Sequence, residues 1–165
     1  MRLKILSWNI WDQGDCGKAA DFLDKENADV IGLQEVKGDD PERDIISHLT
    51  KRGYFYHFAP VEKVWDKIVR SDGPAVFSKY PIRAKETHLL SEENARAAVR
   101  ADIEIEGKII HVFSTHLIHT HQKDSPLQEA QVEKLISLVP KENSIVMGDF
   151  NATPHSTAIQ KMKKV

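Results

Sequence analysis

Four short apolar segments, each ending on a polar residue, constrain the fold of this chain more than any other feature. Residues 3–9, 29–35, 109–116 and 143–149 read LKILSWN, DVIGLQE, IIHVFSTH and NSIVMGD. The first two carry apolar residues on both sides of an extended chain, which is typical of interior strands. Because an interior strand needs other layers on its faces, these segments predict a layered fold with the polar residues at the strand ends.

Segments with helical character separate the strands. They are expected around residues 17–27, 40–53 and 125–140 and from about residue 156 onward. In the third of these, Ser125 is expected as the N-cap, Pro126 as the first helical residue, and Gln128 as the residue that closes a capping box.

The middle of the chain reads as an antiparallel meander. Its strands are expected at residues 84–90, 95–106 and 109–116, with a tight turn between the last two. Residues 54–60 form a further strand, residues 71–81 a turn followed by a short strand, and residues 61–73 include a substrate-facing loop. Mixed strands and helices predict an α/β or α+β fold in a single domain over residues 1–165.

The composition excludes several classes of protein. The chain has 165 residues, a formal net charge of −2 and one cysteine, Cys16. This charge gives no bulk attraction to nucleic acid, although a bound cation would supply local positive charge for a phosphate substrate. One cysteine excludes an intrachain disulfide and favours a reducing compartment. No segment has the length of a membrane span and no secretory signal is evident, so we expect a cytoplasmic protein.

The polar strand ends share one pattern. Alternation with a period of two places each of them on the face of apolar residues in its own strand, and Glu35 falls on the face of Ile31 and Leu33. The four residues are Asn9, Glu35, His116 and Asp149. Each also has an ordinary explanation as a turn residue, a solvated strand end or a structural histidine. Their shared suitability for a hard cation and a phosphate favours a site.

Four motifs occur in the order LKILSWNIW, IGLQEV, FSTHL and GDFNATP, with SDGPAVFSKYPI between the second and the third. Together they resemble the endonuclease/exonuclease/phosphatase superfamily, the deoxyribonuclease I-like phosphoesterases. The resemblance runs from residue 3 to about residue 159. It implies a two-sheet β-sandwich flanked by helices and Mg²⁺-dependent hydrolysis of a phosphate ester, with Mn²⁺ as a substitute. The expected substrate is a phosphodiester, as in a nuclease, with nucleic acid as a candidate partner.

The resemblance also implies roles for single residues. Glu35 is expected as the principal Mg²⁺ ligand, with Asn9 beside it holding the metal and the phosphate. His116 is expected to contact the scissile phosphate and stabilise its developing charge. Asp149 is expected to orient and deprotonate the attacking water, with Asn151 positioning that water and the phosphate.

Two arginines of the segment NARAAVRADI are further candidates. Arg96 or Arg100 could bind the phosphate through two parallel hydrogen bonds, as guanidinium groups do. The ordinary alternative for either residue is a solvated charge on a strand.

The chain departs from the family pattern at its C-terminal end. The family continues into a strand with an aspartate and a Ser-Asp-His motif, and no such tripeptide occurs here. Three interpretations follow: a fragment of a longer protein, a short member that completes its site differently, or a fold that binds phosphate without turnover. Strands absent from the C-terminal end would leave a sheet edge unpaired, which favours self-association.

A second class of function rests on the histidines of the segment THLIHTHQKD. His116, His119 and His121 suggest a zinc hydrolase, although the Asp and the last His of the metallo-β-lactamase motif are misplaced. Substrate choice is expected to lie in the loops 36–41, 61–73 and 117–125. The second of these interleaves basic residues with Trp65, a pattern that suits a nucleic-acid backbone and a stacked base but is also that of an ordinary solvated loop. These basic residues are Lys63, Lys67 and Arg70.

Overall fold

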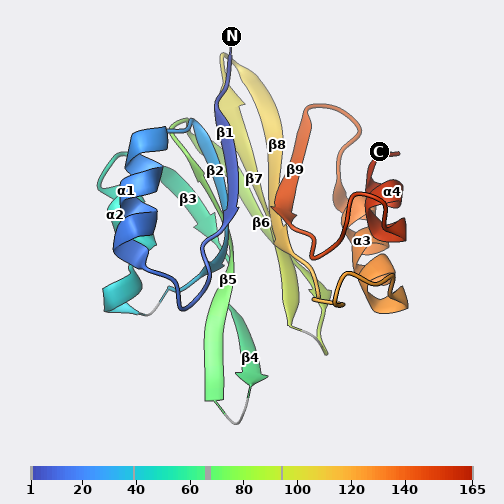
Figure 1. The fold of residues 1–165 in the computed structure, drawn as a ribbon. Helices are drawn as coiled ribbons and strands as arrows, with labels where there is room; N and C mark the ends of the chain where they lie inside the picture. The colour runs from blue at the N-terminus through green and yellow to red at the C-terminus, as the bar shows by residue number, and fades with distance from the viewer. Residues whose placement is uncertain (1, 39, 66–67, 94, 165) are drawn as a thin grey trace.

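The computed structural model describes residues 2–38, 40–65, 68–93 and 95–164, which form two β-sheets packed face to face with helices outside them (Figure 1). The first sheet contains β1 (Ile5–Asn9), β2 (Val30–Val36), β3 (Phe55–Phe58), β4 (Val61–Trp65) and β5 (Ile68–Ser78). The second contains β6 (Ile82–Ser91), β7 (Arg96–Ile105), β8 (Lys108–His116) and β9 (Ser144–Asp149). The predicted fold class, a two-sheet sandwich flanked by helices, is confirmed.

The strand order brings the N-terminal and C-terminal strands to the same side of the sandwich (Figure 1). In the first sheet the order is β1-β2-β5-β3, with β4 paired to β5; in the second it is β6-β7-β8-β9. The strands β6, β7 and β8 form the predicted antiparallel meander, whereas β1 pairs with β2, and β8 with β9, in parallel. Parallel pairing requires a crossover, which helices supply in both cases.

Two helices cover the outer face of each sheet (Figure 1). On the first sheet lie α1 (Cys16–Glu26) and α2 (Ile45–Thr50), with the short 3₁₀ helix η1 (Pro41–Arg43) before α2. On the second lie α3 (Pro126–Leu138) and α4 (Thr157–Met162). None of the described helices is long and apolar enough to cross a membrane.

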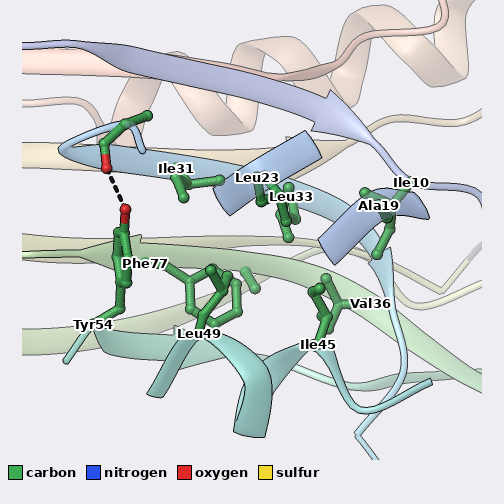
Figure 2. Close-up of a cluster of buried hydrophobic side chains, with 12 residues drawn as sticks. Ile10, Ala19, Leu23, Ile31, Leu33, Val36, Ile45, Leu49, Tyr54 and Phe77 are labelled. Carbon is green, nitrogen blue, oxygen red and sulfur yellow. Dashed lines mark hydrogen bonds between the residues drawn. The ribbon is translucent and has the colours of Figure 1, made fainter. Parts of the chain in front are cut away.

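The helices of the first sheet pack on a continuous apolar cluster. Leu23 of α1 and Leu49 of α2 meet Ile31 and Phe77 of the sheet, all buried (Figure 2). Burying side chains of this size contributes about 1.5–3 kcal/mol each. The hydroxyl of Tyr54 donates to the carbonyl of Ala28 at 2.6 Å, so the polar end of this buried ring is also satisfied.

The two sheets approach closely behind their carboxyl ends. At Gly32, an added Cβ would lie 2.7 Å from the sulfur of Met147, so a larger residue here would require the Met147 side chain to move. Farther along β2, the buried Gln34 donates from Nε2 to Ser114 Oγ at 3.1 Å, and that hydroxyl donates to the carbonyl of Leu33 at 3.2 Å. This buried polar link joins the sheets directly beneath the strand ends.

Two local predictions are wrong. The region 61–73, expected to be a loop, is a hairpin of β4 and the eleven-residue strand β5, which projects beyond the sandwich (Figure 1). Ser125 does precede α3, but its side chain makes no capping hydrogen bond, and Gln128 is buried against other segments instead. Lys67 lies outside the described residues, and the side chains of Lys63, Trp65 and Arg70, the other candidates for nucleic-acid contact, are not described either, although their backbone belongs to β4 and β5.

Candidate active site

The four polar strand ends meet at one end of the sandwich. Asn9 donates from Nδ2 both to Glu35 Oε1 at 2.8 Å and to Asp149 Oδ2 at 2.9 Å. One amide thus joins a carboxylate of the first sheet to a carboxylate of the second. His116 lies against the same pair, with Nδ1 3.9 Å from Glu35 Oε1 and Nε2 3.8 Å from Asp149 Oδ2.

Glu35 reaches this cluster through a β-bulge. Ile31 and Leu33 face the helix-side core, so strict alternation would turn Glu35 toward the helices as well. The pairing of β2 with β5 instead gains one residue between Leu33 and Val36, and Glu35 takes a φ of 59°. A bulge redirects side chains and raises the local twist. The expectation that Glu35 shares the face of Ile31 and Leu33 is therefore wrong, although the residue does join the cluster.

The segment after β9 folds back to place Asn151 beside the strand ends. Its backbone N–H donates to Asp149 Oδ1 at 2.8 Å, and its φ of 49° is left-handed, a conformation that asparagine tolerates. Its Nδ2 donates to the carbonyl of Leu117 at 2.9 Å and lies 3.1 Å from His116 Nε2. An amide nitrogen can only donate, so His116 Nε2 is the acceptor in this contact.

Arg96 supplies positive charge that interacts with this cluster, while Arg100 does not take part. Burial lowers the pKa of the Arg96 guanidinium, and the carboxylates of Asp72, Glu35 and Asp149 act in the opposite direction. Its Nε is buried and has no hydrogen-bond partner in the described structure. Arg100 lies on the outer face of the second sheet, where it binds Asp102 through Nε at 2.7 Å and Nη2 at 2.9 Å.

Two buried glutamines of α3 hold in place the segments that follow β8 and β9. Gln128 donates from Nε2 to the carbonyls of Ile118, Phe150 and Asn151, at 2.9, 3.0 and 3.2 Å. Gln131 accepts from the N–H of Ile118 at 3.0 Å through Oε1. These contacts satisfy backbone groups of two irregular segments that would otherwise be costly to bury. The sequence pattern did not indicate this role, because Gln128 reads as the residue that closes a capping box and Gln131 as an ordinary position of an amphipathic helix.

The loop after β1 is tied to the same cluster. The N–H of Trp11 donates to Asn9 Oδ1 at 2.9 Å, and the N–H of Asp12 donates to Glu35 Oε2 at 2.8 Å. Asn9 and Glu35 are thereby fixed from a third direction. Side chains held by several partners keep their positions when a charged ligand arrives, which is what a binding site requires.

An open hollow of about 610 Å³ adjoins the cluster on the side of α4. It is lined by Asp149 and Asn151, by His119 and Gln122 of the loop after β8, and by the segment that leads to α4. Asp149 keeps 30% of its side chain exposed, whereas His116 keeps 11%. Water and a substrate can therefore reach Asp149 from this hollow.

The donor set suits a hard cation better than zinc. Glu35, Asp149 and the Asn9 amide offer oxygen ligands, and Mg²⁺ takes only one or two carboxylates while keeping several waters. Among the described residues, no three His, Cys, Asp or Glu side chains are placed to hold a metal together. The exposed rings of His119 and His121 contact each other at 4.7 Å, while His116 is buried in the cluster with Glu35 and Asp149.

A family model described as the endonuclease/exonuclease/phosphatase family matches residues 6–164. The chain belongs to this family. The predicted resemblance is confirmed, and the four polar strand-end residues fall within the matched residues.

Individual members of the endonuclease/exonuclease/phosphatase family resemble the chain at low identity. Phospholipase C of Staphylococcus aureus is 23% identical over an alignment of 187 residues, which covers 96% of this chain and 56% of that protein. The chain thus spans little more than half the length of this curated relative.

Solved structures of the family share the fold. ANGEL2, a 2′,3′-cyclic phosphatase in complex with adenosine-2′,3′-vanadate, has a TM-score of 0.79 and 17% identity, covering 98% of this chain and 57% of that one. A beta toxin mutant from Staphylococcus aureus with bound magnesium ions has a TM-score of 0.75 and 23% identity, covering 99% of this chain and 70% of that one. At these identities the likeness establishes the fold.

Proposed function

We propose that the chain carries the site of a Mg²⁺-dependent phosphoesterase that hydrolyses a phosphodiester by in-line attack of water. The observation that carries this proposal is the Asn9 amide, which joins Glu35 and Asp149 across the two sheets at 2.8 and 2.9 Å. Two carboxylates held this close to one another, with an imidazole beside them, suit a cation and a reacting water rather than a purely structural contact.

Glu35 and Asn9 are the residues that would hold Mg²⁺, with Mn²⁺ as a substitute. When bound, the ion would neutralise the phosphate oxygens and polarise the ester. Both Glu35 carboxylate oxygens already accept hydrogen bonds, one from Asn9 and one from the Asp12 backbone, so the carboxylate is oriented in advance. Because the Asn9 amide nitrogen donates to both carboxylates and its oxygen is held by the Trp11 N–H, Asn9 would act on the ion by fixing the carboxylates beside it.

The other residues act on the water and on the phosphate. Asp149 orients the attacking water and accepts its proton, and the backbone N–H of Asn151 holds Asp149 Oδ1 so that Oδ2 faces the cluster. His116 and the Asn151 amide stabilise the charge that develops on the phosphate oxygens. Arg96, whose guanidinium stays charged at neutral pH, binds a further phosphate oxygen.

The comparisons support this reaction class without defining the substrate. The relatives are a phospholipase C, a 2′,3′-cyclic phosphatase and a toxin with bound magnesium ions, which share a phosphate ester or a magnesium site in their descriptions. We also propose that the whole protein is cytoplasmic and that its phosphodiester substrate is a nucleic acid. A fold that binds phosphate without turnover is the second candidate, since no three His, Cys, Asp or Glu side chains among the described residues are placed to hold a metal together.

The proposal is tested by hydrolysis of bis(p-nitrophenyl) phosphate and p-nitrophenyl phosphate with Mg²⁺, Mn²⁺ or Zn²⁺. We expect Mg²⁺ to support turnover of the diester and Asp149→Ala to reduce kcat roughly 10²- to 10⁴-fold, the range for loss of a general base. Asp21→Ala, the same change on the exposed face of α1, is the matched control and should not alter the rate.

Two outcomes would overturn the mechanism. Activity that requires Zn²⁺ and survives Asp149→Ala would exclude Asp149 as the base. Absence of turnover with every metal, together with Mg²⁺ binding that is lost in Glu35→Gln, would instead support the phosphate-binding candidate.

A further inference from the structure

The loop between β1 and α1 presents an exposed tryptophan next to the proposed site. Trp11 follows Asn9 by two residues, and 61% of its surface is exposed. Its φ is 55°, in the left-handed region. A bulky residue is a genuine outlier in this conformation, so the surrounding contacts must impose it.

Four hydrogen bonds impose the conformation. The Trp11 N–H is held by Asn9 Oδ1 at 2.9 Å, and the next N–H, of Asp12, by Glu35 Oε2 at 2.8 Å. The Trp11 carbonyl accepts from the N–H of Gly14 at 2.8 Å and from Arg43 Nη2 at 2.8 Å. The side chain is therefore presented by a rigid loop whose anchors are the residues of the site itself.

Two further features stabilise the conformation of this loop. Arg43 also donates from Nη1 to the carbonyl of Gly14, so one guanidinium from η1 closes the loop at both ends. At Gly14, an added Cβ would lie 2.6 Å from the carbonyl oxygen of Ile10, so glycine is required for the closure.

Among the described residues, the Trp11 ring has neither an aromatic nor a cation partner. Trp8, three residues earlier, packs edge-on against Phe22 with ring centroids 5.0 Å apart. Within the described part of the chain, Trp11 makes no comparable contact with a ring or a cation. A strained, anchored and exposed indole beside a phosphate site is arranged to contact something outside the chain.

We propose that Trp11 is a stacking platform for a nucleobase carried by the substrate, so that the phosphoester bound at Asn9, Glu35 and Asp149 belongs to a nucleotide. This inference rests on the proposed function and specifies its substrate class. A planar base offers an aromatic face to any indole, and such stacking contributes to affinity with little dependence on base identity.

The surroundings of Trp11 favour a base over a lipid surface. The residues that follow it in the loop, Asp12 to Asp15, are polar or glycine. Contact with a membrane is made by a contiguous apolar patch, and a single indole flanked by polar residues does not form one. The single indole ring of Trp11, held at a fixed position, suits contact with one planar base next to a phosphate.

The test compares two diesters that share a leaving group: thymidine 5′-(p-nitrophenyl phosphate) and methyl p-nitrophenyl phosphate. We expect the wild-type chain with Mg²⁺ to prefer the nucleoside ester in kcat/KM. Trp11→Leu should reduce that preference by about tenfold, the scale of one stacked base, and Trp11→Phe should retain most of it. Phe55→Leu, a change at another exposed aromatic residue (48% exposed) on β3, is the control and should keep the preference.

The unfolding temperature of each Trp11 variant must also be measured, because the loop is hydrogen-bonded to Asn9 and Glu35. Trp11→Gly relieves the left-handed conformation, so it should unfold at the same or a higher temperature than the wild type while losing the preference. An unchanged preference in Trp11→Leu would overturn the inference. So would an equal loss for both esters, which would make Trp11 a structural support, or a Trp11-dependent preference for sphingomyelin or phosphatidylcholine vesicles.

A binding experiment tests the role of Trp11 even if the chain does not hydrolyse phosphodiesters. If neither ester is hydrolysed, binding of AMP and of ribose 5-phosphate is compared by calorimetry in the presence of Mg²⁺. Tighter binding of AMP that disappears in Trp11→Leu would support the platform on a non-catalytic chain. Equal affinities for the two phosphates in the wild type would overturn it.

Discussion

At the scale of single residues, charge placement separates the site from the rest of the surface. The site holds Glu35 and Asp149 near one amide and one imidazole, and the charge of Arg96 interacts with both carboxylates. The outer face of the second sheet pairs its charges directly instead: Asp102 accepts from Arg100 and lies 2.7 Å from His111 Nδ1. The first arrangement leaves capacity for a ligand, and the second uses its charges for stability.

The Asp102 pair gives a pH-dependent prediction. Burial acts to raise the pKa of Asp102, but the hydrogen bonds and charges of Arg100 and His111 outweigh it, and the pKa lies below its ordinary value. A carboxyl whose folded pKa is depressed stabilises the fold above its unfolded pKa of about 3.9, and this contribution is lost as pH falls through the folded pKa.

We therefore expect Asp102→Asn to lower the free energy of unfolding by about 1–3 kcal/mol at pH 7, the range for hydrogen bonds to a charged group. The difference from the wild type should shrink as the pH falls below about 4, because both proteins then lack the charge. Urea unfolding at several pH values measures this, with Asp21→Asn as the exposed control. A difference that stays constant down to pH 2 would show that the charge of Asp102 is not responsible.

At the scale of secondary-structure elements, alternation along strands accounts for three of the four strand-end residues. Asn9, His116 and Asp149 lie on the sheet faces that a period of two assigns to them, because β1, β8 and β9 are regular up to their last residue. Glu35 joins them only through the extra residue of the β2 bulge. A bulge depends on the pairing of β2 with β5, so it cannot be read from β2 alone.

Other elements could not be predicted for related reasons. The hairpin of β4 and β5 is formed by residues whose charge and glycine content are typical of a loop, and pairing between the strands outweighs that local preference. Gln128 satisfies the general sequence criterion for a capping box, yet its amide is taken by three carbonyls that are distant in sequence. Long-range partners of this kind leave no local pattern.

Gln128 gives a prediction at this scale. Gln128→Met keeps the side-chain volume but removes the donor to three carbonyls, so it should destabilise the chain by about 1–3 kcal/mol. It should also reduce kcat, because Asn151 and Phe150 lose their attachment to α3. Gln160→Met, which removes one exposed hydrogen bond to Pro154, should do neither to the same degree. Thermal unfolding and diester hydrolysis of both variants measure the difference, and equal effects would refute the role of Gln128.

At the scale of the whole molecule, the two sheets end side by side. The strand orders place β1 and β9 at one end of each sheet, and each has a single paired neighbour among the described strands. Free strand edges offer backbone donors and acceptors to another chain. Self-association through such an edge therefore stays a prediction of this fold.

Light scattering over a range of protein concentrations tests self-association. We expect the mass to rise above that of the 18.7 kDa monomer as concentration increases. Ile5→Lys, which places a charge at a 40% exposed position of β1, should shift the chain toward the monomer, whereas Leu127→Lys on α3 should not. A monomer mass at every concentration would contradict the prediction.

We propose above that Glu35, Asn9 and Asp149 form one Mg²⁺-dependent hydrolytic site across the two sheets. The most direct measurement is the initial rate of bis(p-nitrophenyl) phosphate hydrolysis as Mg²⁺ is titrated into the wild-type chain and into Asp149→Ala. We expect a rate that saturates with Mg²⁺ in the wild type and falls at least about 10²-fold in the variant at saturating Mg²⁺. Equal Mg²⁺-dependent rates in the two proteins would contradict it.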